Sequence, residues 1–323
     1  MIEQIINGIK YRLNEETFTA AVTCLLKGDS IEDYVGDIKI PGTVEFDGVP
    51  YCVTSIDEET FFDCKSLTSI TIPESLTSIE DGAFRGCDSL TAIVVTEGNS
   101  VYDSRDNCNA IIETATNTLI CGCQNTIIPN SVKKIGRCAF IHCESLFSII
   151  IPDSVTSIGV GAFYGCESLS EVTIPDSVKS IEAEAFIYCT SLTSIVIPDS
   201  IKIIGKSAFE ECERLNSVII GKSVKNIESN AFNNCSSLKA IDIPDSVMII
   251  QNGAFADCKS LKIIALPSNA MIIENGAFAN CNSWRVIRYG GTVKQCERRF
   301  RYWDQCFHSE IVYCTDGDTQ IHW

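Results

Sequence analysis

The most regular feature of the chain is a recurring pattern of apolar and polar positions. One repeat begins at Cys166 and reads CESLSEVTIPDSVKSIEAEAFIY, and the next begins at Cys189, so the period is 189 − 166 = 23. A period of this length is typical of solenoid proteins, in which each repeat covers the apolar side of its neighbour. The recurring apolar positions of this repeat are Leu169, Val172, Ile174, Val178, Ile181, Ala185 and Phe186.

Three short elements are predicted within each repeat. The spacing Leu169-x-x-Val172-x-Ile174 is that of the strand in leucine-rich repeats. A proline follows and ends the strand, because it has no N–H to donate. The next pair, Val178 and Ile181, predicts a second short extended stretch, and Ala-Phe-x-x-Cys predicts a short helical turn. The phenylalanines of these turns are expected to form an internal aromatic spine: Phe84, Phe140, Phe163, Phe186, Phe209, Phe232, Phe255 and Phe278.

Half of the 18 cysteines belong to the repeat. These nine are Cys64, Cys87, Cys143, Cys166, Cys189, Cys212, Cys235, Cys258 and Cys281. Successive members lie one period apart, except that the numbers of Cys87 and Cys143 differ by 56, which is 23 + 33. Cysteine is a small apolar residue that suits a buried corner, and a continuous row of thiols cannot all pair. We therefore expect these cysteines to be mostly free thiols.

The additional length between Cys87 and Cys143 forms an insertion at about 96–128, and this segment predicts a hairpin. Two apolar runs flank the turn at 114–117 in the stretch AIIETATNTLI. Folding the chain about this turn places Cys108 opposite Cys123, since 108 + 123 equals 114 + 117. The alternatives are a cross-strand disulfide and two neighbouring free thiols.

The repeat divides the chain into three parts. Residues 1–63 are predicted to be an N-terminal cap with a first partial repeat, residues 64–290 the solenoid, and residues 291–323 a C-terminal cap. Hairpin signals occur in the first part around residues 14–16 and at Asp47-Gly48, and a helix is predicted over 292–303. Caps of this kind cover the open strand edges at the ends of a solenoid.

The motif L-x-x-I-x-I-P-D-S-V-x-x-I-x-x-x-A-F-x-x-C-x-S, repeated over residues 38–290, resembles the BspA-like leucine-rich repeat family of bacterial surface proteins. The resemblance implies repeat units stacked in a curved, right-handed array with hairpin caps. It also implies a secreted or surface-exposed, non-catalytic protein that binds host or extracellular-matrix proteins. The N-terminus lacks a basic start followed by an apolar stretch, so the alternatives are removal of a signal peptide and a cytoplasmic protein.

Composition and the scarcity of catalytic residue types agree with a non-enzymatic role. The net charge is 25 − 42 = −17, which repels phosphates and argues against nucleic-acid binding. The chain has only three histidines, and the Asp-Ser pairs that recur in the repeats are not accompanied by the histidine that a Ser-His-Asp catalytic site would need. The zinc-ligand types Cys306, His308, Cys314 and His322 have no standard zinc spacing. We expect no catalytic residue, metal, cofactor or small-molecule substrate.

The exposed side of the first strand is the predicted binding face. Residues between the core positions of these strands face outward, and they carry few charges. The residues predicted to bind a partner are Val94, Ile150, Thr173, Val196, Ile219 and Asp242. Strand propensity alone also explains this composition. The alternative function is therefore a structural spacer or self-assembling element, and a basic cluster at 285–301 would suit weak self-association or an acidic partner.

Overall fold

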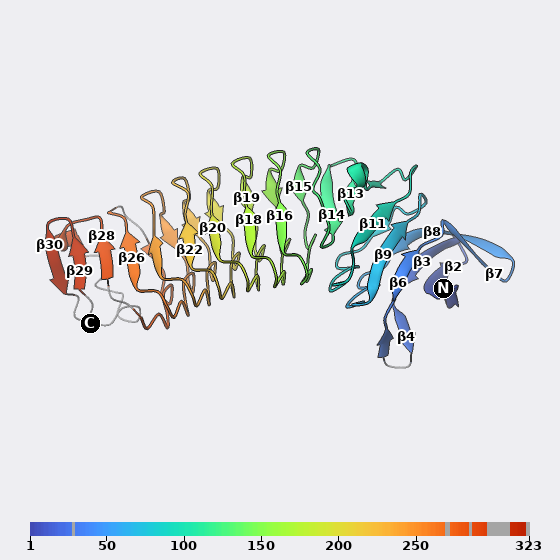
Figure 1. The fold of residues 1–323 in the computed structure, drawn as a ribbon, viewed down its shortest axis with the longest axis horizontal. Coiled ribbons are helices and arrows are strands. Elements are labelled where there is room, and N and C mark those ends of the chain that lie inside the picture. Colours follow the sequence, from blue (N-terminus) through green and yellow to red (C-terminus); the bar gives the residue numbers. More distant parts are fainter. Residues whose placement is uncertain (28–29, 269–271, 284–285, 296–310, 321–323) are drawn as a thin grey trace. The chain divides into compact units, whose positions relative to one another are not determined.

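The computed structural model consists almost entirely of short β-strands joined by turns (Figure 1). The chain forms two compact units, Met1–Leu146 and Phe147–Trp323. Within the described ranges, no helix has the length and apolar composition of a membrane span. A helical turn occupies residues 293–295, and the rest of the helix predicted over 292–303 lies outside the described residues. The structure describes residues 1–27, 30–268, 272–283, 286–295 and 311–320.

In the second unit, the first strand of each repeat lies beside the corresponding strand of its neighbour (Figure 1). Where neighbouring first strands pair, the pairing is parallel and joins equivalent positions of successive repeats, as in Ser148↔Glu171 and Ser194↔Ser217. The strands are β16 (Ser148–Ile150), β18 (Glu171–Thr173), β20 (Ser194–Val196), β22 (Ser217–Ile219), β24 (Ala240–Asp242), β26 (Ile263–Leu266) and β28 (Val286–Tyr289). An antiparallel pair, β29 (Ile311–Cys314) and β30 (Gly317–Gln320), continues the sheet, with β29 parallel to β28.

The predicted second extended stretch forms a separate parallel sheet. In the second unit its strands pair in chain order, with Ile158, Ile181, Ile204, Ile227 and Ile250 in corresponding positions. The side chains of these isoleucines point into the core. The strands are β17 (Ser157–Ile158), β19 (Ser180–Ile181), β21 (Ile203–Ile204), β23 (Asn226–Ile227), β25 (Ile249–Ile250) and β27 (Ile272–Ile273).

The corner that follows each second strand differs from the predicted helical turn. Its amides donate three residues back, as from Tyr164 to Gly161 and from Cys166 to Phe163, in a succession of tight turns. Two residues per corner have positive φ, for example Glu184 at 63° and Tyr188 at 58°. A residue in the left-handed region cannot continue a right-handed α-helix, so the corner remains a chain of turns.

The phenylalanine of each corner fills the core. In the second unit, neighbouring rings from Phe163 to Phe278 stack with centroids 5.1–5.3 Å apart and planes within 10°. We call this row the phenylalanine ladder. The side chains are fully buried, and the predicted aromatic spine is confirmed here. Corner amides also bind the next repeat, as from Phe163 N to Ala185 O at 2.8 Å, which holds the rings in register.

The first unit combines N-terminal hairpins with repeat strands. The predicted hairpins are confirmed by the antiparallel pairs β2–β3 and β7–β8. One sheet has the order β1-β2-β3-β8-β10, with β7 on β8, a second has the order β11-β9-β6, and β4 pairs with β5. The strands are β1 (Ile2–Ile6), β2 (Ile9–Asn14), β3 (Thr19–Thr23), β4 (Leu25–Lys27), β5 (Ser30–Glu32), β6 (Gly36–Lys39), β7 (Thr43–Phe46), β8 (Val49–Ile56), β9 (Leu67–Ile72), β10 (Ser78–Ile79) and β11 (Ala92–Val95).

The insertion contains the predicted hairpin, but its cysteines do not face each other as the simple register requires. The strands are β12 (Tyr102–Asp103), β13 (Ala110–Glu113), β14 (Thr118–Gly122) and β15 (Lys134–Ile135), with the 3-10 turn η1 at Arg105–Asn107. A bulge between Ile111 and Ile112 shifts the register. Cys108 and Cys123 are both free thiols, so the disulfide alternative was wrong.

We expect Phe209→Ala to lower the free energy of unfolding by about 3–5 kcal/mol, because the ring is fully buried and stacked on both sides. Urea denaturation followed by circular dichroism would measure the change. The control is Phe147→Ala, since the Phe147 side chain is 66% exposed and its loss should cost little. Equal losses for the two variants would contradict a stabilising role for the ladder.

Candidate binding face and the cysteine-lined cavity

The exposed side of the first-strand sheet carries aliphatic side chains in the second unit. Ile150 is 85% exposed, Val196 55% and Ile219 59%. Strand alternation explains this, because the preceding residues Ile149, Ile195 and Val218 point into the core. The pairing places Val196 directly opposite Ile219 on neighbouring strands β20 and β22.

The side chains around these aliphatic residues are mostly small or hydroxylated. Thr173 lies opposite Ile150 in the register, and Ser194 lies opposite Ser217. Glu171 and Asp242 contribute exposed carboxylates to the same side of the sheet. This surface therefore combines an apolar centre with a sparse acidic border. We call the exposed residues Ile150, Thr173, Val196, Ile219 and Asp242 the sheet face.

The sixth predicted binding residue, Val94, belongs to the first unit. It lies on β11, where it pairs with Thr71 of β9, and its side chain is 48% exposed. All six predicted residues are thus exposed at the outward positions of first strands. Five of them belong to the second unit, and only these five are assigned to the sheet face.

A second group of exposed apolar residues, which was not predicted from the sequence, lies on the other sheet. Ile203 on β21 and Ile272 on β27 point outward, and Met248 lies just before β25. The outward residue is followed by an inward one in these strands, as Ile203 is followed by the buried Ile204. The three exposed residues offer a comparison surface of similar chemistry on a different side of the repeats.

The repeat cysteines are buried beside the phenylalanine ladder. Their thiols donate weakly to a phenylalanine carbonyl oxygen of the preceding repeat, as from Cys189 to Phe163 at 3.3 Å and from Cys281 to Phe255 at 3.0 Å. The predicted free state is confirmed for the described cysteines. Burial raises the pKa of Cys143 to about 12 and raises those of Cys189 and Cys235 well above their ordinary value. These thiols stay protonated and act as packing groups.

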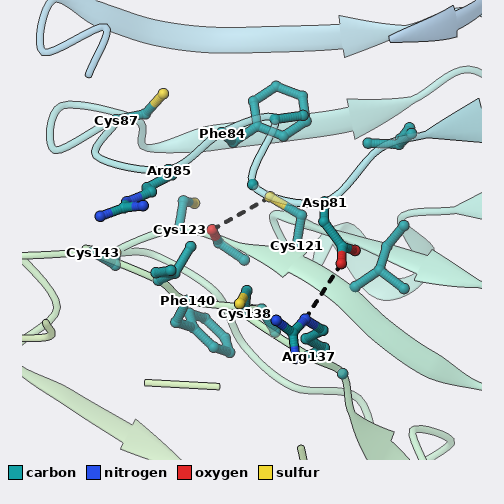
Figure 2. Close-up of a pocket in the computed structure, with 18 of the residues that line it drawn as sticks. Asp81, Phe84, Arg85, Cys87, Cys121, Cys123, Arg137, Cys138, Phe140 and Cys143 are labelled. Atoms are coloured by element: carbon teal, nitrogen blue, oxygen red, sulfur yellow. Dashed lines mark hydrogen bonds and ion pairs between the residues drawn. The ribbon is translucent and has the colours of Figure 1, made fainter. Parts of the chain in front are cut away.

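The first unit contains a cavity of about 270 Å³ beside the insertion. Figure 2 shows Phe84 and Phe140 on opposite sides of the cavity, with Cys121 and Cys123 between them. Cys87, Cys138 and Cys143 also line it, so five thiols share the wall. Within the described ranges, no three His, Cys, Asp or Glu side chains are placed to hold a metal.

Charged groups lie at the border of this cavity. Arg137 Nε and Asp81 Oδ2 are 3.3 Å apart and form an exposed ion pair across two corners (Figure 2). Arg85 Nη2 lies 3.3 Å from His142 Nε2, and its guanidinium carbon lies 5.4 Å from the centroid of the Phe62 ring. The cavity wall therefore combines aromatic rings and thiols with charged and polar side chains.

The comparisons with known proteins agree with the fold described above. A family model for the BspA type leucine-rich repeat region matches residues 45–112, 116–239 and 179–306, with six copies. The chain belongs to the BspA-type leucine-rich repeat family. The repeat period and the leucine-rich repeat fold predicted from the sequence are thereby confirmed. No curated protein matches the chain.

Two solved structures of leucine-rich repeat proteins are similar to this BspA-type chain. One, from Bacteroides ovatus, is 26% identical, has a TM-score of 0.59, and is matched over 96% of this chain and 76% of its own. The other, from Eubacterium ventriosum, is 20% identical, has a TM-score of 0.59, and is matched over 86% of this chain and 94% of its own. The second likeness concerns the fold alone.

Other sequence predictions lie partly or wholly outside the described part of this BspA-type protein. Three of the four residues considered as zinc ligands, Cys306, His308 and His322, are not described, and neither are most of the arginines of the 285–301 cluster. The boundaries 1–63, 64–290 and 291–323 stay predictions. The cavity was not predicted from the sequence, because the repeat spacing does not show which residue of the insertion stands at the position of a corner phenylalanine.

The buried thiols of this BspA-type repeat predict a loss of stability at alkaline pH. Burial raises the pKa of Cys64 and of Cys108 to about 11, and that of Cys143 to about 12, from an ordinary value of 9.0. Above about pH 9 the unfolded chain loses these protons while the folded chain keeps them, so the free energy of unfolding should fall as pH rises.

Urea denaturation at about pH 7 and about pH 10 would measure this fall. In the triple variant Cys189→Ala, Cys212→Ala, Cys235→Ala, fewer buried thiols remain to titrate, so the difference between the two pH values should be smaller. A stability that is constant up to about pH 10.5 in the unchanged protein would contradict the expectation.

Proposed function

We propose that this protein is a non-catalytic protein-binding module that contacts its partner through the sheet face. The observation that carries the proposal is the set of three aliphatic side chains, Ile150, Val196 and Ile219, each more than half exposed on the same side of parallel strands. A group of exposed apolar side chains on a regular surface is typical of an interaction site. Membership of a leucine-rich repeat family supports the same class of function.

The chemistry of the sheet face favours a folded protein as the partner. Its strands present exposed aliphatic, hydroxylated and small side chains at regularly spaced outward positions, as a folded protein surface could cover. Glu171 and Asp242 border the apolar centre, and the whole protein carries a net charge of −17. A partner with an apolar centre and a basic border would complement both features, and its approach would be accelerated electrostatically.

We propose that this activity takes place outside the cell, and membership of the BspA-type family supports this proposal. The partner would then be a host or extracellular-matrix protein. A structural spacer or self-assembling element is the competing function, and it predicts a molecular mass that rises with concentration in light scattering. The proposed binding module predicts a constant mass with no partner present.

The test is a triple variant with Ile150→Lys, Val196→Lys and Ile219→Lys. These side chains are exposed, so the fold should survive while the apolar centre of the face is lost. We expect the wild-type protein to retain a matrix protein in a pull-down from extracellular-matrix extract, and the variant to lose it. Circular dichroism and the urea midpoint check that the variant is folded.

The matched control carries the same change on the other sheet, with Ile203→Lys, Met248→Lys and Ile272→Lys. These residues are similarly exposed, at 48%, 54% and 60%, and the added charge is the same. The control should retain the partner. If both triple variants lose it, charge rather than the sheet face governs binding, and if neither loses it, the sheet face is not the site.

A further inference from the structure

The cavity of the first unit lies beside the stacked corner phenylalanines of that unit. Phe61 and Phe84 stack with centroids 5.1 Å apart and planes within 5°. The next corner phenylalanine along the chain is Phe140, on the opposite side of the cavity (Figure 2). The insertion separates Phe84 from Phe140 in the sequence. Among the described residues, no ring of the first unit stacks on the face of Phe84 that points away from Phe61.

The backbone takes the course of a corner between these two rings, but it carries no ring there. Gly122 N donates to Ala139 O at 2.8 Å, the same bond that Phe163 N makes to Ala185 O in a regular repeat. Gly122 therefore stands where a ladder phenylalanine would stand. A Cβ at this residue would lie 2.1 Å from the Phe140 ring, so that ring leans over the glycine.

The corner before the cavity also lacks its usual acceptors. In the second unit, Gly161 N donates to Ala183 O at 3.0 Å and Phe163 N to Ala185 O at 2.8 Å. The corresponding amides belong to Gly82 and Phe84, and both residues line the cavity. Within the described part of the chain, these two amides donate to no acceptor.

We propose that this cavity binds an aromatic side chain carried on an extended backbone, such as an exposed strand of a protein partner presents. The ring would stack on Phe84, as Phe84 itself stacks on Phe61. The two carbonyl oxygens on either side would accept from the Gly82 and Phe84 amides, as alternate carbonyls do in a regular corner. The ligand thus supplies what the next repeat supplies elsewhere in the fold.

The surroundings suit this ligand better than a charged one. The wall includes Phe84, Phe140 and protonated thiols such as Cys121 and Cys143, and it also includes the polar residues Glu113 and Thr118. The nearby cations Arg137 and Arg85 lie against Asp81 and His142. An aromatic ring flanked by two peptide carbonyls matches the rings and thiols of the wall and the two open amides together.

The probe is the blocked dipeptide N-acetyl-Ala-Phe-N-methylamide, titrated into the full chain and followed by NMR. Two reference compounds distinguish the contribution of the ring from that of the carbonyl oxygens, because N-acetyl-Ala-Ala-N-methylamide lacks the ring and toluene lacks the carbonyls. We expect the Ala-Phe peptide to bind at least about tenfold more tightly than either compound. Equal binding of toluene, or no binding of the Ala-Phe peptide at about 1 mM, would overturn the proposal.

Alkylation of thiols locates the peptide without any substitution. Cys138 lines the cavity and is partly exposed, whereas Cys52 is exposed on β8 away from it. The Ala-Phe peptide should slow the alkylation of Cys138, measured by mass spectrometry, and leave that of Cys52 unchanged. Unchanged alkylation of Cys138 by a saturating peptide would place the peptide elsewhere and refute the site.

Two substitutions test the ladder argument. Gly122 does not have a positive φ, so Gly122→Phe is compatible with its backbone, and the new ring should displace that of Phe140 and abolish peptide binding. Phe84→Leu keeps an apolar side chain but removes the stacking surface, and should weaken binding about tenfold. Its matched control is Phe209→Leu, the same change in an uninterrupted part of the ladder, which should leave peptide binding unchanged.

This site is independent of the sheet face. The triple variant of Ile150, Val196 and Ile219 should bind the peptide as the wild type does, and Gly122→Phe should still retain a partner of the sheet face. Peptide binding that survives in a folded Gly122→Phe variant would refute the proposed site, whatever the outcome for the sheet face.

Discussion

The solenoid of this protein depends on burial of one repeat by the next. A single repeat is too short to enclose its own apolar side chains, so it is stable only when neighbours cover it on both sides. The stacked rings at 5.1–5.3 Å and the corner amides that donate to the next repeat are the two forms of this contact. Ring packing supplies the buried apolar area, and the backbone bonds set the register.

The same constraint explains why the surface can specialise. The packing of one repeat on the next fixes the residues at the core positions, including the corner phenylalanines and the thiols. Residues at the outward positions of the first strands take no part in this packing. Ile150 and Glu171 are therefore equally compatible with the fold although one is aliphatic and one charged. The outward residues are therefore free to differ from repeat to repeat, and the proposed sheet face depends on this freedom.

Where the stacking of one repeat on the next is interrupted, groups that stacking covers elsewhere are left uncovered. Where Gly122 stands in place of a ring, the neighbour no longer covers Phe84, and two corner amides face a cavity instead of carbonyl oxygens. A solenoid that is complete would have no such opening along its length. The insertion thus exposes, at one place, the interactions that hold the rest of the molecule together, and this is why an aromatic peptide is its natural complement.

The sequence by itself determined the repeat, the two strands per unit, the buried phenylalanines and the free thiols, because each follows from a local period of apolar residues. It was wrong about the corner helix, since positive φ values at residues such as Glu184 and Tyr188 are set by the tight return of the chain. The sequence also did not reveal the bulge at Ile111 and Ile112, which shifts the register so that Cys108 is no longer directly opposite Cys123. Only the tertiary structure decided that Gly122 takes a ring's position, because the insertion that contains Gly122 does not follow the repeat, and the bond from Gly122 to Ala139 forms only when the insertion folds back onto the next corner.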